Sequence, residues 1–287
     1  MKIHIQKRVL TVLLVADAVA ATMGATQAPA DRTRTVYISA TDAKGAPVTD
    51  LTAADVTVKE GGKDQKIANL KAATAPMHVA IVVDDDGTGV FQNTVGQFIQ
   101  ATTAHAKFSI RLLDPWVTTL CDYTEDVSAL QTALGRLGRR AQVPQEQGGD
   151  LGPAISGAVK ELEKLKAERP VILVLTVGGE ASQSKQSSVG VPLDELKNSG
   201  AGLYTIFLRG GDSSILGDGP KESGGIGEGF GNKAGIPATL AKILDRLTHQ
   251  YALSYTLPDG VKMGDRLIVE TSRKGVVLVA PTRIPDK

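Results

Sequence analysis

Two apolar runs, at residues 77–83 and 171–176, constrain the fold of this chain more than any other feature of its sequence. Runs of this length are typical of strands covered on both faces, because a half-exposed strand would alternate apolar with polar residues. Around them we expect further strands at residues 108–113, 116–121 and 203–208, and helices at residues 90–104, 127–137, 151–166, 193–198 and 236–250. This alternation predicts an α/β fold with a doubly wound, mostly parallel, Rossmann-like sheet.

The two ends of the chain follow a different pattern, with a period of two residues. Alternating segments at residues 35–41, 55–60 and 65–70 precede the α/β region, and others at residues 251–257, 266–272 and 275–280 follow it. Neither group is large enough to bury a core alone. We therefore expect the N-terminal module (34–75) and the C-terminal strands (251–287) to form one small β-sandwich, into which the α/β domain (76–250) is inserted.

The N-terminal segment has the layout of a secretory signal. Lys2, Lys7 and Arg8 precede an apolar run at residues 9–20, and small residues offer cleavage sites after Ala20 or Ala28. The run is short for a transmembrane helix, so we expect no stable membrane span after cleavage. Residues 1–28 thus predict an exported protein, in the periplasm, cell envelope or extracellular space. The alternatives are an N-terminal anchor or a misplaced start.

Composition excludes several classes of protein. The 287 residues include 32 basic and 31 acidic ones, so a formal net charge of +1 offers no attraction to nucleic acid. Aromatic residues, at 4%, are too scarce for base-stacking surfaces. A single cysteine excludes an intrachain disulfide and a cysteine-based zinc cage. Composition therefore gives no support for a nucleic-acid partner.

Candidate site residues lie where the first apolar run ends, in the sequence Asp84-Asp85-Asp86-Gly87-Thr88. In a parallel sheet, ligands bind at the carboxyl ends of the strands. Three consecutive carboxylates there repel one another unless a cation or a proton intervenes. Packing alone does not explain them, so this position is the most informative one for function.

The chain resembles von Willebrand factor A domains, in particular the secreted VWFA-related subfamily of acidobacteria. The resemblance covers nearly the whole mature chain, in the ordered segments 36–42, 44–48, 51–60, 65–67, 79–84 and 251–258. It implies a non-enzymatic protein-binding module that acts at the cell envelope. It also implies a metal-ion-dependent adhesion site at the end of the first strand, where Mg²⁺ is held by oxygen ligands and one position is left for a partner's carboxylate.

This sequence departs from the family's metal-site pattern. Asp84 matches the first aspartate of the Asp-x-Ser-x-Ser motif, but Asp86 and Thr88 replace its two serines. Asp150 stands where a threonine ligand is usual, and Val177 replaces a second aspartate. The resemblance implies Asp84, Asp86, Thr88 and Asp150 as ligands of Mg²⁺ or another divalent cation. The other interpretation is a degenerate site that serves as a binding scaffold, or whose charges are neutralised by lysine or arginine neighbours.

A phosphatase is the alternative function. The run 81–88 also resembles the first motif of haloacid-dehalogenase-type phosphatases, with Asp84 as nucleophile and Asp86 as general acid and base. In this interpretation Thr176 and Asp212 stand for the later motifs, and Mg²⁺ bridges Asp84 and phosphate. A short motif of this kind is weak without its structural context.

Two further segments lead to simpler expectations. Arg136, Arg139 and Arg140 follow a predicted helix, where we expect a solvated helix end rather than an anion site. Residues 209–233 are rich in glycine and serine, which predicts a mobile surface loop.

Overall fold

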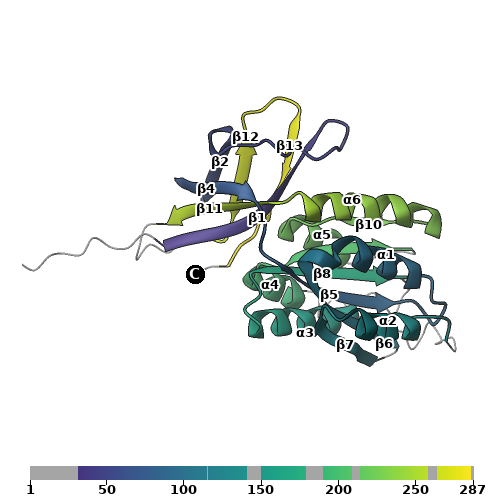
Figure 1. The fold of residues 1–287 in the computed structure, drawn as a ribbon. Helices are drawn as coiled ribbons and strands as arrows, with labels where there is room; N and C mark the ends of the chain where they lie inside the picture. The colour runs from purple at the N-terminus through teal and green to yellow at the C-terminus, as the bar shows by residue number, and fades with distance from the viewer. Residues whose placement is uncertain are drawn as a thin grey trace, which may run out of the picture.

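The computed structural model describes residues 32–114, 116–140, 150–178, 190–208, 214–257 and 264–285. Their strands form a six-stranded sheet, a four-stranded sheet and a three-stranded sheet. Figure 1 shows the six-stranded sheet with its helices as one body and the two smaller sheets, built from both ends of the chain, as a second body above it. The predicted α/β fold is confirmed.

The six-stranded sheet has the order β10-β9-β8-β5-β6-β7. Its two central strands, β5 (Met77–Asp84) and β8 (Arg169–Thr176), are the two apolar runs of the sequence and pair in parallel. The outer strands are β6 (Ala106–Asp114), β7 (Trp116–Thr124), β9 (Gly202–Phe207) and β10 (Gly227–Gly229). Only β7 runs antiparallel, since it returns from β6 in a hairpin.

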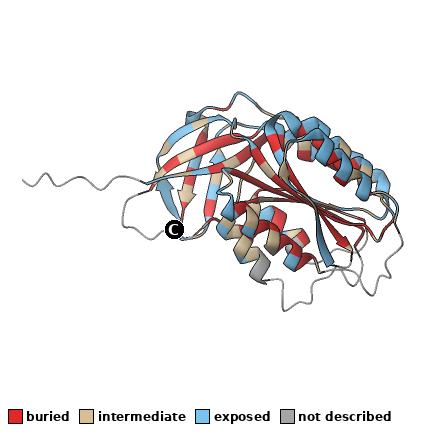
Figure 2. Ribbon diagram, turned by 60° about the horizontal axis from the view of Figure 1, so that its bottom comes forward, coloured by how far each residue is buried: buried red, intermediate tan, exposed pale blue. Residues whose placement is uncertain are grey.

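Helices cover both faces of this sheet. In Figure 2 the strands are coloured as buried and lie between helices that are exposed on part of their surface. One face packs against α1 (Gln92–Thr102), α2 (Val127–Arg136) and α6 (Ile236–Thr248). The opposite face packs against α3 (Leu151–Lys164), α4 (Gly190–Ser199) and α5 (Ser214–Ser223). Alternate residues of β5 and β8 therefore enter two different cores, which is why both strands are apolar throughout.

The second body joins the two ends of the chain. Its four-stranded sheet has the order β13-β1-β11-β4, and its three-stranded sheet the order β12-β2-β3. The strands are β1 (Arg32–Asp42), β2 (Val56–Glu60), β3 (Lys63–Gln65), β4 (Ile67–Ala72), β11 (Tyr251–Leu257), β12 (Leu267–Thr271) and β13 (Val276–Val279). We call this body the β module. Its core draws on strands from both ends, which confirms the predicted insertion of the α/β domain.

A buried polar network lies inside the β module. Glu60 is fully buried, and its carboxylate pairs with Arg34 at 3.1 Å and accepts a hydrogen bond from the Tyr255 hydroxyl at 2.7 Å. Burial, and then the Glu60 carboxylate, raise the pKa of Tyr255, so this hydroxyl remains a donor. The network links β1, β2 and β11, and therefore connects the module's two sheets.

The glycine-rich segment at residues 209–233 is not a loop throughout, so that prediction was wrong. Its described part contains α5 and strand β10. The glycines permit close packing: a Cβ atom on Gly225 would lie 1.7 Å from the Leu203 carbonyl oxygen, and one on Gly227 would lie 2.6 Å from that of Leu216. Glycine here marks close approach of backbones rather than flexibility.

Residues 1–28, for which a signal peptide is predicted, lie outside the described residues. Within the described ranges, no helix combines the length and the apolar character needed to cross a membrane.

Two neighbouring residues of β12 test the composite core. Leu267 is 2% exposed and belongs to the module's core, whereas Ile268 is 41% exposed. We expect Leu267→Ala to lower the free energy of unfolding by about 2–5 kcal/mol through loss of apolar contact and cavity formation. Ile268→Ala, the matched control, should cost less than about 1 kcal/mol. Equal losses in chemical denaturation would contradict the assignment of β12 to a shared core.

Candidate functional site

The candidate site lies at the carboxyl ends of β5 and β8, where Asp84 and Thr176 are register partners. The Thr176 hydroxyl donates a hydrogen bond of 2.6 Å to Asp84 Oδ2, and the Gly178 amide donates one of 2.9 Å to the Thr176 oxygen. The Val177 amide also donates to the Asp84 carbonyl at 2.8 Å. Asp84 is 5% exposed, so these bonds hold its carboxylate in a nearly buried position.

Asp85 is fully buried and pairs with an arginine. Arg140 Nη2 lies 2.5 Å from Asp85 Oδ1, and Arg140 Nε donates to Asp114 Oδ2 at 3.2 Å. One guanidinium thus bridges the ends of β5 and β6. The expectation of a solvated helix end was wrong for Arg140, because it is drawn into the site by two carboxylates that are distant in sequence.

The backbone of the loop after β5 is held by the same segment. The Arg140 amide donates to the Gly87 carbonyl at 2.8 Å, and a Cβ atom on Gly89 would lie 2.8 Å from the Arg139 nitrogen. Asp86 adopts a φ of +52°, a conformation uncommon outside glycine and asparagine. Its Oδ1 atom is buried and has no hydrogen-bond partner among the described residues. A carboxylate oxygen in this state would accept a cation or a donor from outside.

The other two predicted ligands take part in local structure. The Thr88 hydroxyl donates to the Asp85 carbonyl at 2.8 Å, although the side chain is exposed. Asp150 is the N-cap of α3, where its carboxylate accepts from the Gly152 amide at 2.9 Å. Capping of this kind stabilises a helix start and needs no metal.

The four predicted ligands fit a divalent cation only in part. Hard cations prefer oxygen, and Asp84, Asp86 and Thr88 all offer oxygen at one loop. Within the described ranges, however, no three or more His, Cys, Asp or Glu side chains are grouped so that they could hold a metal ion. The positive charge of Arg140 next to Asp85 also opposes a second cation.

An exposed tryptophan lies beside these carboxylates, and we did not predict a role for it. Trp116, the only tryptophan of the chain, is 81% exposed, and its neighbour Val117 is 41% exposed. Trp116 pairs across the β6–β7 hairpin with Asp114, which binds Arg140. Tryptophan is enriched at protein interfaces and among the residues that dominate their binding energy. The sequence signal that could have located Trp116 is the short connection between the predicted strands at residues 108–113 and 116–121. A hairpin there puts Trp116 at the carboxyl end of the first of these strands.

The geometry of the described residues offers no support for the phosphatase alternative. Asp84 Oδ2 already accepts the Thr176 hydroxyl in a nearly buried setting, whereas a nucleophile must reach its substrate. Asp212, the candidate for the later acidic motif, lies outside the described residues.

No known family model matches the sequence, and no curated protein matches it either. Solved structures are similar at the level of the chain trace. They include a mutant of the PilB minor pilin from Streptococcus sanguinis (12% identity, TM-score 0.44, 62% of each chain covered). They also include the von Willebrand factor domain of the type V pili tip protein Mfa5 from Porphyromonas gingivalis (13% identity, TM-score 0.42, 61% of this chain and 96% of that chain covered). A third is a von Willebrand factor type A protein from Catenulispora acidiphila (9% identity, TM-score 0.43, 91% of this chain and 75% of that chain covered).

The match to the pilin spans less than two thirds of that protein's chain. At such low identities and TM-scores, these similarities do not decide what this chain binds.

Removing the bridging guanidinium tests whether it holds the site together. Arg140→Met leaves the fully buried Asp85 without its counter-charge, and we expect a loss of about 3–5 kcal/mol in the free energy of unfolding. Arg139→Met, at the exposed neighbouring residue, should have little effect. In a double-mutant cycle, Asp85→Asn should recover much of the loss. Additive effects of the two changes would contradict the proposed coupling.

Proposed function

We propose that this chain is a non-enzymatic protein-binding module of the von Willebrand A type, which contacts its partner through the carboxyl end of the six-stranded sheet. One observation carries the proposal: the 81% exposed Trp116 stands beside the connected set Asp114, Arg140 and Asp85. An apolar anchor rimmed by ordered charged groups is the usual anatomy of a protein interface.

The state of the carboxylates supports binding rather than catalysis. Asp84 accepts from Thr176, and Asp85 is paired with Arg140, so both contribute to the rigidity of the loop. Because internal contacts already order these side chains, little conformational entropy is lost when a partner binds there. We therefore propose that the module has no catalytic activity of its own.

The proposal includes export and a role in protein interactions at the cell envelope. Its support is the signal-like segment at residues 1–28 and the resemblance of the mature chain to the secreted VWFA-related subfamily.

Site-specific photocrosslinking tests the binding surface. A photoreactive residue is placed at Val117, next to Trp116, or at Ile268 on the β module as the matched control, because both positions are 41% exposed. In cells that naturally produce the protein, we expect a discrete crosslinked protein from position 117 and none from position 268. Trp116→Ala should abolish that crosslink, since buried aromatic anchors dominate interface energies.

The fold of the Trp116→Ala variant provides the control for this experiment. Replacement of so exposed a side chain should change stability by less than about 0.5 kcal/mol. A crosslink that is unchanged in Trp116→Ala, or equal from both positions, would contradict binding at this edge.

We also propose that Asp86, with the Asp84 and Thr88 oxygens of the same loop, binds Mg²⁺ or another divalent cation weakly, and that Asp150, which caps α3, is not needed for this binding. The support is the Asp86 Oδ1 atom, which has no hydrogen-bond partner in the part of the chain that the structure describes, and the nearby Arg140 is the reason to expect weak binding. The melting temperature of the wild type should rise with Mg²⁺ concentration, as mass action requires. The rise should disappear in Asp86→Ala and persist in Asp245→Asn, an exposed aspartate on α6.

A melting temperature that does not depend on Mg²⁺, Ca²⁺ or Mn²⁺ would refute the cation site while leaving the Trp116 surface intact. The same Mg²⁺-containing samples should release no phosphate from an aryl phosphate. Saturable release that Asp84→Asn abolishes would instead establish the phosphatase, because loss of a nucleophile lowers rates by several powers of ten.

A further inference from the structure

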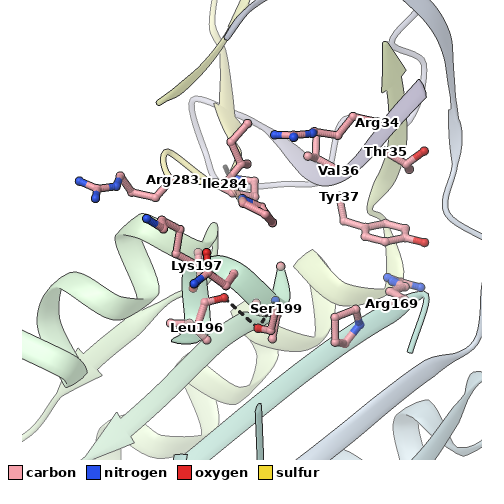
Figure 3. A pocket seen from close by; sticks show the side chains of 18 of the residues that line it. Arg34, Thr35, Val36, Tyr37, Arg169, Leu196, Lys197, Ser199, Arg283 and Ile284 are labelled. Atoms are coloured by element: carbon pink, nitrogen blue, oxygen red, sulfur yellow. Dashed lines mark hydrogen bonds between the residues drawn. The ribbon is translucent and has the colours of Figure 1, made fainter. Parts of the chain in front are cut away.

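A cleft of about 380 Å³ separates the β module from the α/β domain. Strand β1 forms its upper wall, and the start of β8 and the end of α4 form its lower wall (Figure 3). Residues 281–285 close one side. Because β8 and β9 contribute their first residues, Arg169 and Gly202, the cleft lies at the amino ends of the parallel strands, opposite the Asp84 site.

Within the described part of the chain, one edge of the upper wall is an unpaired strand edge. Strand β1 pairs with β11 from Arg32 to Ile38, but β13 covers its other edge only from Ser39 to Asp42. After β13 the chain leaves this edge, and the amides of Thr282 and Arg283 donate to the Glu222 carbonyl instead. Between Thr33 and Tyr37, no described strand pairs with that edge, so alternate N–H and C=O groups of the backbone face the cleft.

Apolar side chains line the cleft on several sides, including Val36 from β1, Leu196 from α4 and Ile284 from the C-terminal segment. An open edge with pockets for alternate side chains suits an extended peptide, which gains affinity from main-chain hydrogen bonds and specificity from its side chains. The cavity volume is in the range of small-ligand sites and would take a few residues of such a strand.

A buried arginine gives the cleft a positive charge. Arg169 is 4% exposed, and its guanidinium donates to the Gln250 side-chain oxygen and the Leu247 carbonyl, both neutral acceptors. It also lies 5.5 Å from the centre of the Tyr37 ring. Burial lowers the pKa of Arg169, and no carboxylate is in ion-pair contact with it among the described residues. A buried cation of this kind favours an anionic ligand.

A second cationic group lies at the side of the cleft. Arg283 and Lys197 share one carboxylate, Asp265, at 2.8 and 3.4 Å. Arg283 Nε is buried without a hydrogen-bond partner in the described structure. Two acidic residues, Glu168 and Glu222, also line the cleft, against five basic ones, Arg32, Arg34, Arg169, Lys197 and Arg283. Of the five, Arg34 is paired with Glu60, and Arg283 and Lys197 are paired with Asp265, so an acidic ligand is favoured chiefly by Arg169.

We propose that this cleft binds an extended acidic segment of a partner protein, which adds as a strand to the open edge of β1. The strand's main chain pairs with the edge between Thr33 and Tyr37, its apolar side chains enter the cleft, and its carboxylates face Arg169 and Arg283. A second copy of this chain fits less well, because edge-to-edge pairing of two β1 strands would bring two basic clefts together.

The test selects eight-residue peptides from a random phage-displayed library on the full chain. We expect enriched sequences with Asp or Glu alternating with apolar residues. The best synthetic peptide should slow amide exchange, measured by NMR, between Thr33 and Tyr37. Arg283→Gln should weaken it about tenfold, which fits the loss of one charge contact at a side chain that is 40% exposed. Arg273→Gln, an ion-paired arginine elsewhere on the β module, is the matched control and should not weaken it.

Several outcomes would overturn the proposal. They are failure to enrich any peptide, enrichment without acidic residues, equal binding to the Arg283→Gln variant, and protection of amides outside β1. Displacement of the peptide by citrate alone would indicate a small-anion pocket. Amide exchange that slows between Thr33 and Tyr37 as the protein concentration rises, without peptide, would indicate a dimer. Trp116→Ala should leave peptide binding unchanged, so failure here and failure of the proposed function are distinguishable.

Discussion

Burial of β5 and β8 on both faces is the constraint on which the rest of this structure depends. Every residue of β8 is buried, and β5 has one half-buried residue, His78. Such strands are stable only when helices cover both faces, so the chain has to pass over the sheet repeatedly in crossover connections. Those crossovers bring the strand ends together at each edge of the sheet. Both candidate binding sites are products of that geometry.

At the carboxyl edge, repulsion among neighbouring acids is resolved by a residue distant in sequence. Asp85 and Asp114 end adjacent parallel strands, and Arg140 reaches both. A buried ion pair of this kind contributes less to net stability than to specifying a single arrangement, because desolvation offsets most of the attraction. The arrangement that it specifies presents Trp116 to solvent in a defined position.

At the amino edge, the insertion of one domain into another creates the cleft that is the second candidate site. Strand β1 pairs with β11 and β13, so the chain must return to its beginning after the whole α/β domain. The returning strand β13 pairs only with the end of β1, from Ser39 to Asp42. The beginning of β1 lines the cleft together with Arg169. Contacts such as Arg169 with Tyr37 and Gln250 connect the two bodies at the same place. The two candidate sites lie at opposite ends of the six-stranded sheet.

The sequence by itself determined the α/β class, the two central strands and the joining of both ends, because apolar periodicity depends on local burial alone. It also located Asp84, Asp86 and Thr88 at a strand end. The prediction of a loop at residues 209–233 was wrong, because packing partners decide the structure there. Gly225 and Gly227 permit close contact between backbones rather than flexibility. Only the tertiary structure decided that Arg140 pairs with Asp85, that Trp116 lies beside them, and that no described strand pairs with one edge of β1 between Thr33 and Tyr37. Each is a long-range contact, and no local pattern encodes which distant residue will supply a charge or leave an edge uncovered.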